Sequence, residues 1–113
     1  MALTELETRR VVKALDELVS RKRPLAHLRD QLDFRWSLEG QSVYLIEVRR
    51  LMNGEHHERP FAKATWVRTQ NVWKIYWQRA DLKWHSYEPV ATVQSIHGFC
   101  TAVEDDPYGC FWS

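Results

Sequence analysis

Apolar residues near the N-terminus recur at the spacing of an amphipathic helix. Thr4 and Glu7 have the spacing of a capping box, and Val11 and Leu15 then fall on one face of a helix. A basic cluster at the end of this pattern suits the negative end of the helix dipole, and a proline follows it. The pattern therefore predicts a helix over residues 4–22.

From Leu32 onward the hydrophobic period changes from helical spacing to alternation, which indicates strands. The predicted strands are residues 32–38, 42–51, 61–69, 72–78 and 82–87. The connections at 39–41, 70–71 and 80–81 are short enough for hairpins, whereas residues 52–60 form a longer polar loop. Residues 32–88 are therefore expected to form an antiparallel meander of about five strands.

The C-terminal part of the chain returns to helical spacing. Thr92 is positioned to cap a helix over residues 92–105, in which Ile96, Phe99 and Val103 share one face. The tail 106–113 is too aromatic for a solvated terminus, so we expect it to pack back on the fold. The sequence thus predicts a single α+β domain, residues 1–113, with both helices packed on one face of the sheet.

Pairing the strands across the predicted turns assigns side chains to the two faces of the sheet. A two-residue turn at 70–71 places Trp66 opposite Ile75 and Ala64 opposite Trp77. A turn at 80–81 places Trp84 beside Trp77. One face then consists of Ala62, Ala64, Trp66, Trp73, Ile75, Trp77, Leu82 and Trp84. We expect the helices to cover this face and to bury Trp66 and Trp77.

The opposite face of these strands is polar, basic and aromatic. It is predicted to present Lys63, Thr65, Lys74, Tyr76, Gln78, Lys83, His85 and Tyr87. Alternating rings and lysines of this kind are used by proteins that bind single-stranded nucleic acid, because rings stack on bases while lysines contact phosphates. The alternative is an ordinary solvated sheet face, which is commonly lined by the same residue types. For the first hairpin, two-residue and three-residue loops both remain open.

Composition narrows the classes of function. The 16 basic and 15 acidic residues leave a net charge of +1, so no overall field attracts nucleic acid or a membrane, and an electrostatic partner requires a local patch. The six tryptophans supply much of the apolar surface for a core. We expect a cytoplasmic protein with no membrane partner, since neither a signal-peptide core nor a membrane-length apolar run is present. In that compartment Cys100 and Cys110 are expected to be reduced.

Two further patterns are candidates for chemistry. Metal ligands are available in His97, Cys100, Cys110, Asp105 and Asp106, but no C-x-x-C pair accompanies them, and a buried free cysteine is a common core residue. The sequence therefore predicts that both cysteines are metal-free. No cofactor is expected.

The second pattern is acidic. Glu47 and Arg49 on one strand, with Asp33 on its neighbour, are similar to the carboxylates and base of metal-dependent nucleases, and an exposed ion pair is the alternative interpretation. His85 is a possible general base, but the sequence places no serine or cysteine nucleophile beside it. No residue is identified as catalytic.

One stretch of the sequence has a specific likeness. Residues 72–89 read V-W-K-I-Y-W-Q-R-A-D-L-K-W-H-S-Y-E-P, and E-D-D-P-Y-G-C-F-W follows near the end. From about Gln41 onward the chain resembles a family of small bacterial proteins known only as a domain of unknown function. The resemblance implies a whole single-domain member, with the Trp112-Ser113 ending as a departure. It implies no activity, cofactor or catalytic residue.

These observations favour a small non-enzymatic binding or adaptor domain whose partner is an unidentified macromolecule, protein or single-stranded nucleic acid. Single-strand binding through Lys63, Lys74, Tyr76, Gln78, Lys83, His85 and Tyr87 is the first alternative. A metal-dependent hydrolase or nuclease is the second.

Overall fold

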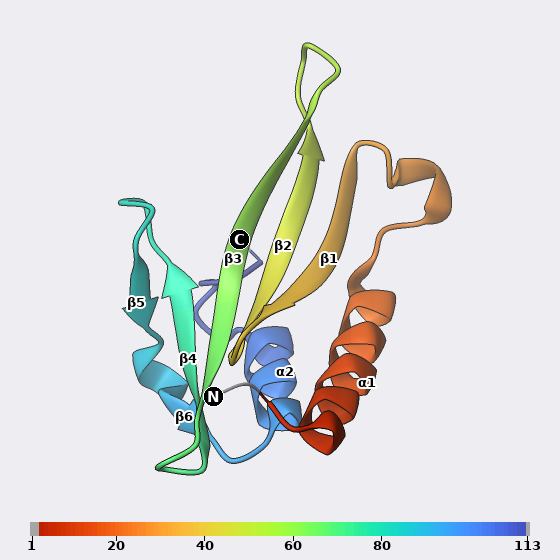
Figure 1. The fold of residues 1–113 in the computed structure, drawn as a ribbon. Helices are drawn as coiled ribbons and strands as arrows, with labels where there is room; N and C mark the ends of the chain where they lie inside the picture. Colours follow the sequence, from red (N-terminus) through yellow and green to blue (C-terminus); the bar gives the residue numbers. More distant parts are fainter. Residues whose placement is uncertain (1–2, 113) are drawn as a thin grey trace.

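The computed structural model describes residues 3–112, which form one six-stranded antiparallel sheet with two long helices against it (Figure 1). The helices are α1 (Glu5–Lys22) and α2 (Ile96–Asp105), and η1 (Ala26–Leu28) and η2 (Glu88–Val90) are short 3₁₀ turns. The strands are β1 (Leu32–Glu39), β2 (Ser42–Arg50), β3 (His56–Val67), β4 (Val72–Gln78), β5 (Trp84–Ser86) and β6 (Thr92–Val93). β1 to β5 pair in chain order, and β6 also pairs with β4. The predicted α+β meander is therefore confirmed.

α1 forms where its sequence signals predict it. The Thr4 hydroxyl accepts a hydrogen bond from the Glu7 backbone N–H at 3.1 Å, and the Glu7 carboxylate accepts one from the Thr4 N–H at 2.8 Å. This reciprocal capping box satisfies two N–H groups that a helix start leaves without partners. The apolar stripe is fully buried, with Val11 at 1% and Leu15 at 0% exposure.

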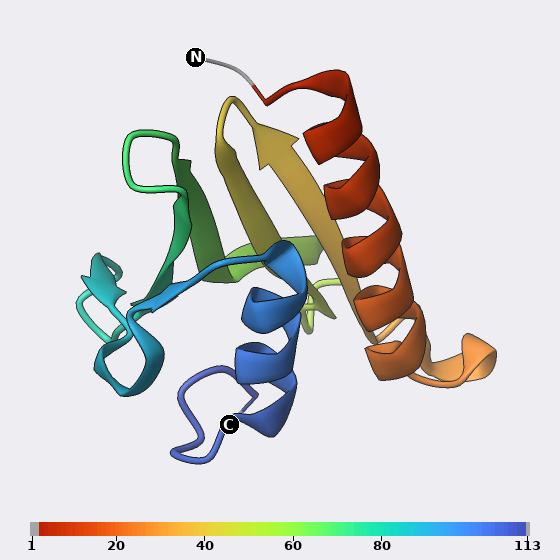
Figure 2. The ribbon, with the colours of Figure 1, turned by 90° about the horizontal axis from the view of Figure 1, so that it is seen from below.

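The two helices lie side by side against one face of the sheet, as Figure 2 shows. α2 and the C-terminal tail lie behind the sheet in the view of Figure 1. Small residues on the packed face, Ala62 and Ala64, have no exposed surface and leave room for the helix side chains. Trp73 is 5% exposed. Trp66 and Trp77 pack against the core but stay partly exposed, so the prediction that the helices bury them fully is wrong.

β3 is longer than its sequence suggests. It begins at His56, so the predicted loop 52–60 is wrong in its second half, where residues pair with the end of β2. An extra residue, Phe61, lies between the Leu45–Ala62 and Ile46–Pro60 pairs. Such a bulge tolerates a proline in the strand, and it accompanies the burial of Phe61, which is 2% exposed.

The β3–β4 hairpin corrects a predicted register, and the β1–β2 hairpin decides between the two loops that the sequence left open. Residues 68–71 form a four-residue connection with Asn71 at φ 54°, and the cross-strand pairs are Trp66–Trp73 and Ala64–Ile75. The predicted pairing is thus wrong by two residues, a shift that leaves every side chain on its predicted face. The first hairpin has a two-residue loop in which Gly40 has a φ of 60°, so the three-residue alternative is wrong.

α2 starts later than predicted. Ser95 rather than Thr92 caps it, through a hydrogen bond of 3.3 Å from the Gly98 N–H to the Ser95 hydroxyl. Thr92 and Val93 instead pair with β4 as β6. A side chain on Gly98 would have its Cβ 2.8 Å from the Val93 Cβ, so the close contact between α2 and β6 requires glycine there.

The C-terminal tail packs on the fold as expected. Phe111 is 4% exposed, and the Trp112 indole N–H donates to the Val103 carbonyl at 2.7 Å. The Asp106 carboxylate accepts backbone N–H groups from Cys110, Phe111 and Trp112 at 2.7 to 3.2 Å. Asp106 therefore holds the turn that brings the tail back under the sheet. Ser113 of the predicted tail lies outside the described residues.

Candidate binding face of the sheet

The face of the sheet away from the helices is built by cross-strand rows. Tyr44, Lys63, Tyr76 and Ser86 are successive partners across β2 to β5. The neighbouring row across β2, β3, β4 and β6 is polar. We define the open face as the side chains of Ser42, Tyr44, Lys63, Thr65, Lys74, Tyr76, Gln78 and Trp84, which these registers place on one side. These side chains come from the four strands β2 to β5.

Aromatic rings surround one lysine on the open face. The Lys63 ammonium lies 5.6 Å from the Tyr44 ring centroid, 5.4 Å from that of Tyr76 and 5.8 Å from that of Trp84. The Tyr44 and Trp84 centroids are 6.0 Å apart, although these residues come from β2 and β5. Each ring attracts the cation through its quadrupole. Because all four side chains are half-buried, the cluster combines positive charge with accessible flat surface.

The lysines of this face form no ion pair with any residue the structure describes, whereas arginines take the carboxylates around the sheet. Arg35 on the outer side of β1 pairs with Glu58 at 2.7 Å. The same side also carries Glu39, in the cross-strand row of Ser42, Thr65 and Lys74, and Glu58, which pairs with Arg35. No described carboxylate pairs with Lys63 or Lys74, so no ion pair neutralises the charges of these two lysines.

The β4–β5 hairpin decides which ring joins this cluster. The predicted turn at 80–81 placed Trp84 on the packed face and His85 on the open face, and both assignments are wrong. Trp84 pairs with Gln78, and His85 pairs with Trp77. The loop has one residue more than predicted, with Leu82 at φ 62°, and a shift of one residue exchanges the two faces.

His85 and Tyr87 therefore leave the predicted site. The His85 Nε2 lies 2.9 Å from the Asp81 carboxylate, in an ion pair of the hairpin loop if the ring is protonated. Tyr87 has no exposed surface, and its ring stacks at a tilt on Phe111 with centroids 4.9 Å apart. Burial raises the pKa of the Tyr87 hydroxyl. Tyr87 is a core residue rather than a surface ring.

The other predicted site residues lie where the alternation placed them. Lys63, Lys74, Tyr76 and Gln78 share the open face, and the Gln78 side-chain amide donates to the Leu82 carbonyl at 3.2 Å. Lys83 is exposed at the end of the β4–β5 loop, beside the cluster in sequence but outside it. Tyr44 and Trp84 were not predicted as site residues. The sequence could have placed Tyr44 on the open face, because the apolar residues Val43 and Leu45 on either side of it point to the core and side chains alternate along a strand.

The carboxylates of the nuclease hypothesis do not come together. Asp33 pairs across strands with Val48, whereas Glu47 pairs with Phe34, so the two carboxylates lie on opposite faces. Asp33 forms an ion pair with Arg23 at 2.6 Å. Burial alone would raise the pKa of Glu47, but hydrogen bonds from Arg49 and Arg59 outweigh it and lower that pKa. Both carboxylates are thus neutralised by arginines.

The cysteines lie in different surroundings. Cys100 is buried on α2, with its Sγ 3.8 Å from the Ala14 carbonyl, and burial raises its pKa to about 12. Cys110 is half-buried in the tail. Within residues 3–112 no group of three or more His, Cys, Asp or Glu side chains is arranged to hold a metal ion. A thiol with so high a pKa is a poor nucleophile at neutral pH.

The fold and this face define a small α+β domain with a helix-covered side and an open aromatic side. The chain belongs to the family described as "Domain of unknown function (DUF3024)", whose model matches residues 3–113. Comparison with curated proteins and with solved structures gave no match. Among the described helices none is both long and apolar enough to cross a membrane.

Proposed function

We propose that this domain is a non-enzymatic binding module that holds single-stranded nucleic acid on its open face. The observation that carries the proposal is the group of three rings, Tyr44, Tyr76 and Trp84, around Lys63, which forms no ion pair with a described residue. Rings of this kind stack on bases of any sequence, and lysines meet the phosphates between them. We further propose that the protein acts in the bacterial cytoplasm.

Local charge supports a polyanion over a neutral partner. Lys63 and Lys74 lie on adjacent cross-strand rows, and Lys83 follows in the next loop. No described carboxylate pairs with them, so a phosphate does not have to displace an existing partner. Three phosphate contacts predict a slope of about −2 in a plot of log affinity against log salt, because each contact on a single strand releases roughly 0.7 of a counterion.

The experiment is a titration of labelled single-stranded DNA and RNA oligonucleotides, at several salt concentrations, with fluorescence anisotropy as the readout. We expect little sequence preference and binding that weakens with salt. Tyr76→Ala should weaken binding by about 1 to 3 kcal/mol with the slope unchanged, because it removes a stacking surface. Tyr76→Phe is the matched control, since it keeps the ring.

Charge variants separate phosphate contacts from general electrostatics. Lys74→Gln should flatten the slope by about 0.7, whereas Lys13→Gln, which removes the same charge from the exposed side of α1, should leave it unchanged. Absence of binding at low salt, or equal effects of the two lysine variants, would contradict the proposal.

A further inference from the structure

A second site lies on the other side of the sheet, where α1, α2 and the β3–β4 hairpin meet. A pocket of about 140 Å³ opens there between the helices and two tryptophans, Trp66 and Trp73. The two indole rings are tilted by 51° with centroids 5.5 Å apart, and together they form one apolar wall. A cavity of roughly 150 Å³ is large enough to hold a benzene ring. The pocket therefore has room for one small ring.

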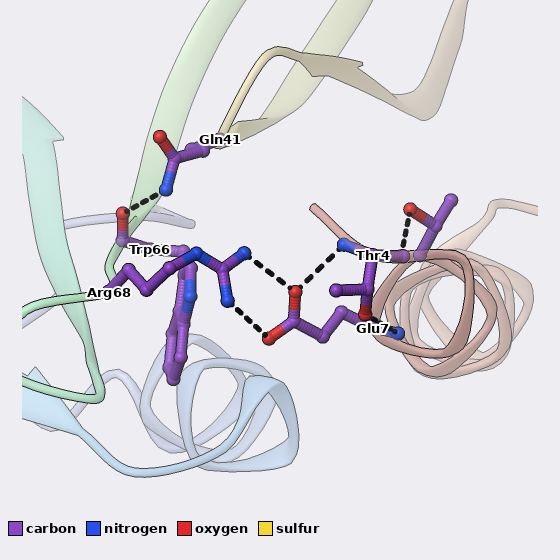
Figure 3. A network of polar contacts seen from close by, with 6 residues as sticks. Thr4, Glu7, Gln41, Trp66 and Arg68 are labelled. Atoms are coloured by element: carbon purple, nitrogen blue, oxygen red, sulfur yellow. Dashed lines mark hydrogen bonds and ion pairs between the residues drawn. The ribbon is translucent and has the colours of Figure 1, made fainter. Parts of the chain in front are cut away.

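A polar network holds this pocket in shape. Arg68, just after β3, reaches across to α1 and binds the Glu7 carboxylate at 2.9 Å, beside the Trp66 indole (Figure 3). The same carboxylate caps the Thr4 N–H. Hydrogen bonds from Arg68, followed by that from Thr4, lower the pKa of Glu7. The Glu7 carboxylate is therefore ionised at neutral pH, and the Arg68 guanidinium balances its charge. Among the described residues that line the pocket Glu7 is the one carboxylate, and Arg68 and Thr4 already bind it.

The remaining polar groups around the pocket are mainly donors without partners. The guanidinium of Arg10 forms no ion pair within residues 3–112, and His97 makes no hydrogen bond there. The Trp66 indole N–H is buried without an acceptor. At the start of α2 the Gly98 N–H is capped by Ser95, whereas the N–H groups of Ile96 and His97 have no helical acceptor. An apolar wall and a rim of unpaired donors together fit a ligand with a flat ring and a negative charge.

We propose that this pocket binds a small aromatic carboxylate, with the ring against Trp66 and Trp73 and the carboxylate held by Arg10. The guanidinium suits a carboxylate in two-point contact. A neutral ring would leave Arg10 without its partner, and an aliphatic carboxylate would leave the indole wall uncovered. The site is separate from the open face, so it does not depend on the proposed nucleic-acid binding.

The test uses benzoate as the probe and the intact protein. In two-dimensional NMR spectra the indole N–H signals of Trp66 and Trp73 should shift with saturation in the millimolar range, as expected of a ligand with so few atoms. Benzyl alcohol and acetate, which lack the charge and the ring respectively, should bind at least about tenfold more weakly. The indole N–H of Trp84 on the open face should not move.

Arg10→Gln should weaken benzoate binding about tenfold, whereas Lys13→Gln, which removes a charge one turn further along α1, should leave it unchanged. Both positions are exposed, so neither variant should threaten folding. Equal binding of benzoate and benzyl alcohol would reduce the site to an apolar cavity and overturn the proposal. Failure of benzoate to shift either indole signal, or equal losses in the two variants, would overturn it as well.

Discussion

The two faces of the sheet use the same strands for opposite purposes. On the packed face Ala62 and Ala64 leave space that helix side chains fill, and Trp73 is almost fully buried. On the open face Lys63, which lies between these two alanines on β3, keeps its charge accessible, and Tyr76 on β4 keeps its ring accessible. Alternation along β3 and β4 thus separates stability from binding, residue by residue. Substitutions at adjacent positions should therefore have different consequences.

The largest expected difference is between Trp73 and Tyr76. Trp73→Ala should lower the free energy of unfolding by about 3 to 5 kcal/mol, because it removes a large buried side chain. Tyr76→Ala, from the open face, should lower it by about 1 kcal/mol or less. Denaturant unfolding of the two variants makes the comparison. Similar losses would mean that the faces are not energetically distinct.

A matched pair on β3 tests the packing of the core. Ala64→Leu should cost about 1 to 3 kcal/mol, because Ala64 has no exposed surface and the helices leave no room for a larger side chain. Thr65→Leu, one residue later on the open face, should cost less, about 0.5 to 1 kcal/mol, because it removes only the hydrogen bond of 2.8 Å between the Thr65 and Ser42 hydroxyls. Thermal unfolding of both variants is the measurement. A tolerated leucine at position 64 would show that the helix layer is loosely packed.

Acid should affect the two sides of the sheet unequally. The pKa of Glu47 and that of Glu58 are both lowered in the fold, by Arg49 and Arg59 against the effect of burial and by Arg35 respectively. A lowered pKa contributes stability that is present above the unfolded value, about 4.3, and is lost as the pH falls through the folded value. Because Glu47 is 14% exposed and Glu58 is 49% exposed, protonation of Glu47 should cost more.

Two variants measure this difference. Glu47→Gln should lower stability at neutral pH and remove more of the acid sensitivity than Glu58→Gln does, because a solvent-exposed pair contributes little. The measurement is the denaturation midpoint of each variant between about pH 7 and pH 3. A larger change in pH dependence for Glu58→Gln would contradict the prediction that the shielded ion pairs of Glu47 contribute more of the acid sensitivity of folding.

The smallest expected effect concerns Lys83, at the margin of the open face. Lys83→Gln should flatten the salt dependence of single-strand binding by about 0.7 in slope and leave folding unchanged. Salt titrations of the variant and the parent protein measure it. An unchanged slope would confine the phosphate contacts to Lys63 and Lys74.

Local signals predicted the helices better than the hairpins. The capping box at Thr4 and the stripe through Val11 and Leu15 are complete within a few turns, so α1 was predicted almost to the residue. The start of α2 was missed because Thr92 and Ser95 are equally good caps by composition. Only the tertiary pairing of Val93 with Trp73 on β4 decides between them.

Whether the predicted site residues lay on the correct face depended on whether each predicted hairpin register was wrong by an even or an odd number of residues. The two-residue error at β3–β4 kept Lys63 and Tyr76 on the correct face, but the one-residue error at β4–β5 exchanged Trp84 with His85. The correct loop needs Leu82 in the left-handed region, which a leucine rarely adopts, so no sequence signal marks it. A binding surface that is assembled across hairpins can therefore be predicted from sequence only where the length of each connecting turn can be predicted.

The most direct test of the open face uses the tryptophans as built-in reporters. Trp84 lies on the open face and Trp73 on the packed face, so their indole N–H signals report on the two sides separately. During titration with a single-stranded oligonucleotide of about 12 nucleotides, the Trp84 signal should shift with the salt dependence of binding while that of Trp73 stays fixed. A static Trp84 signal, or a shift confined to Trp73, would contradict single-strand binding on the open face.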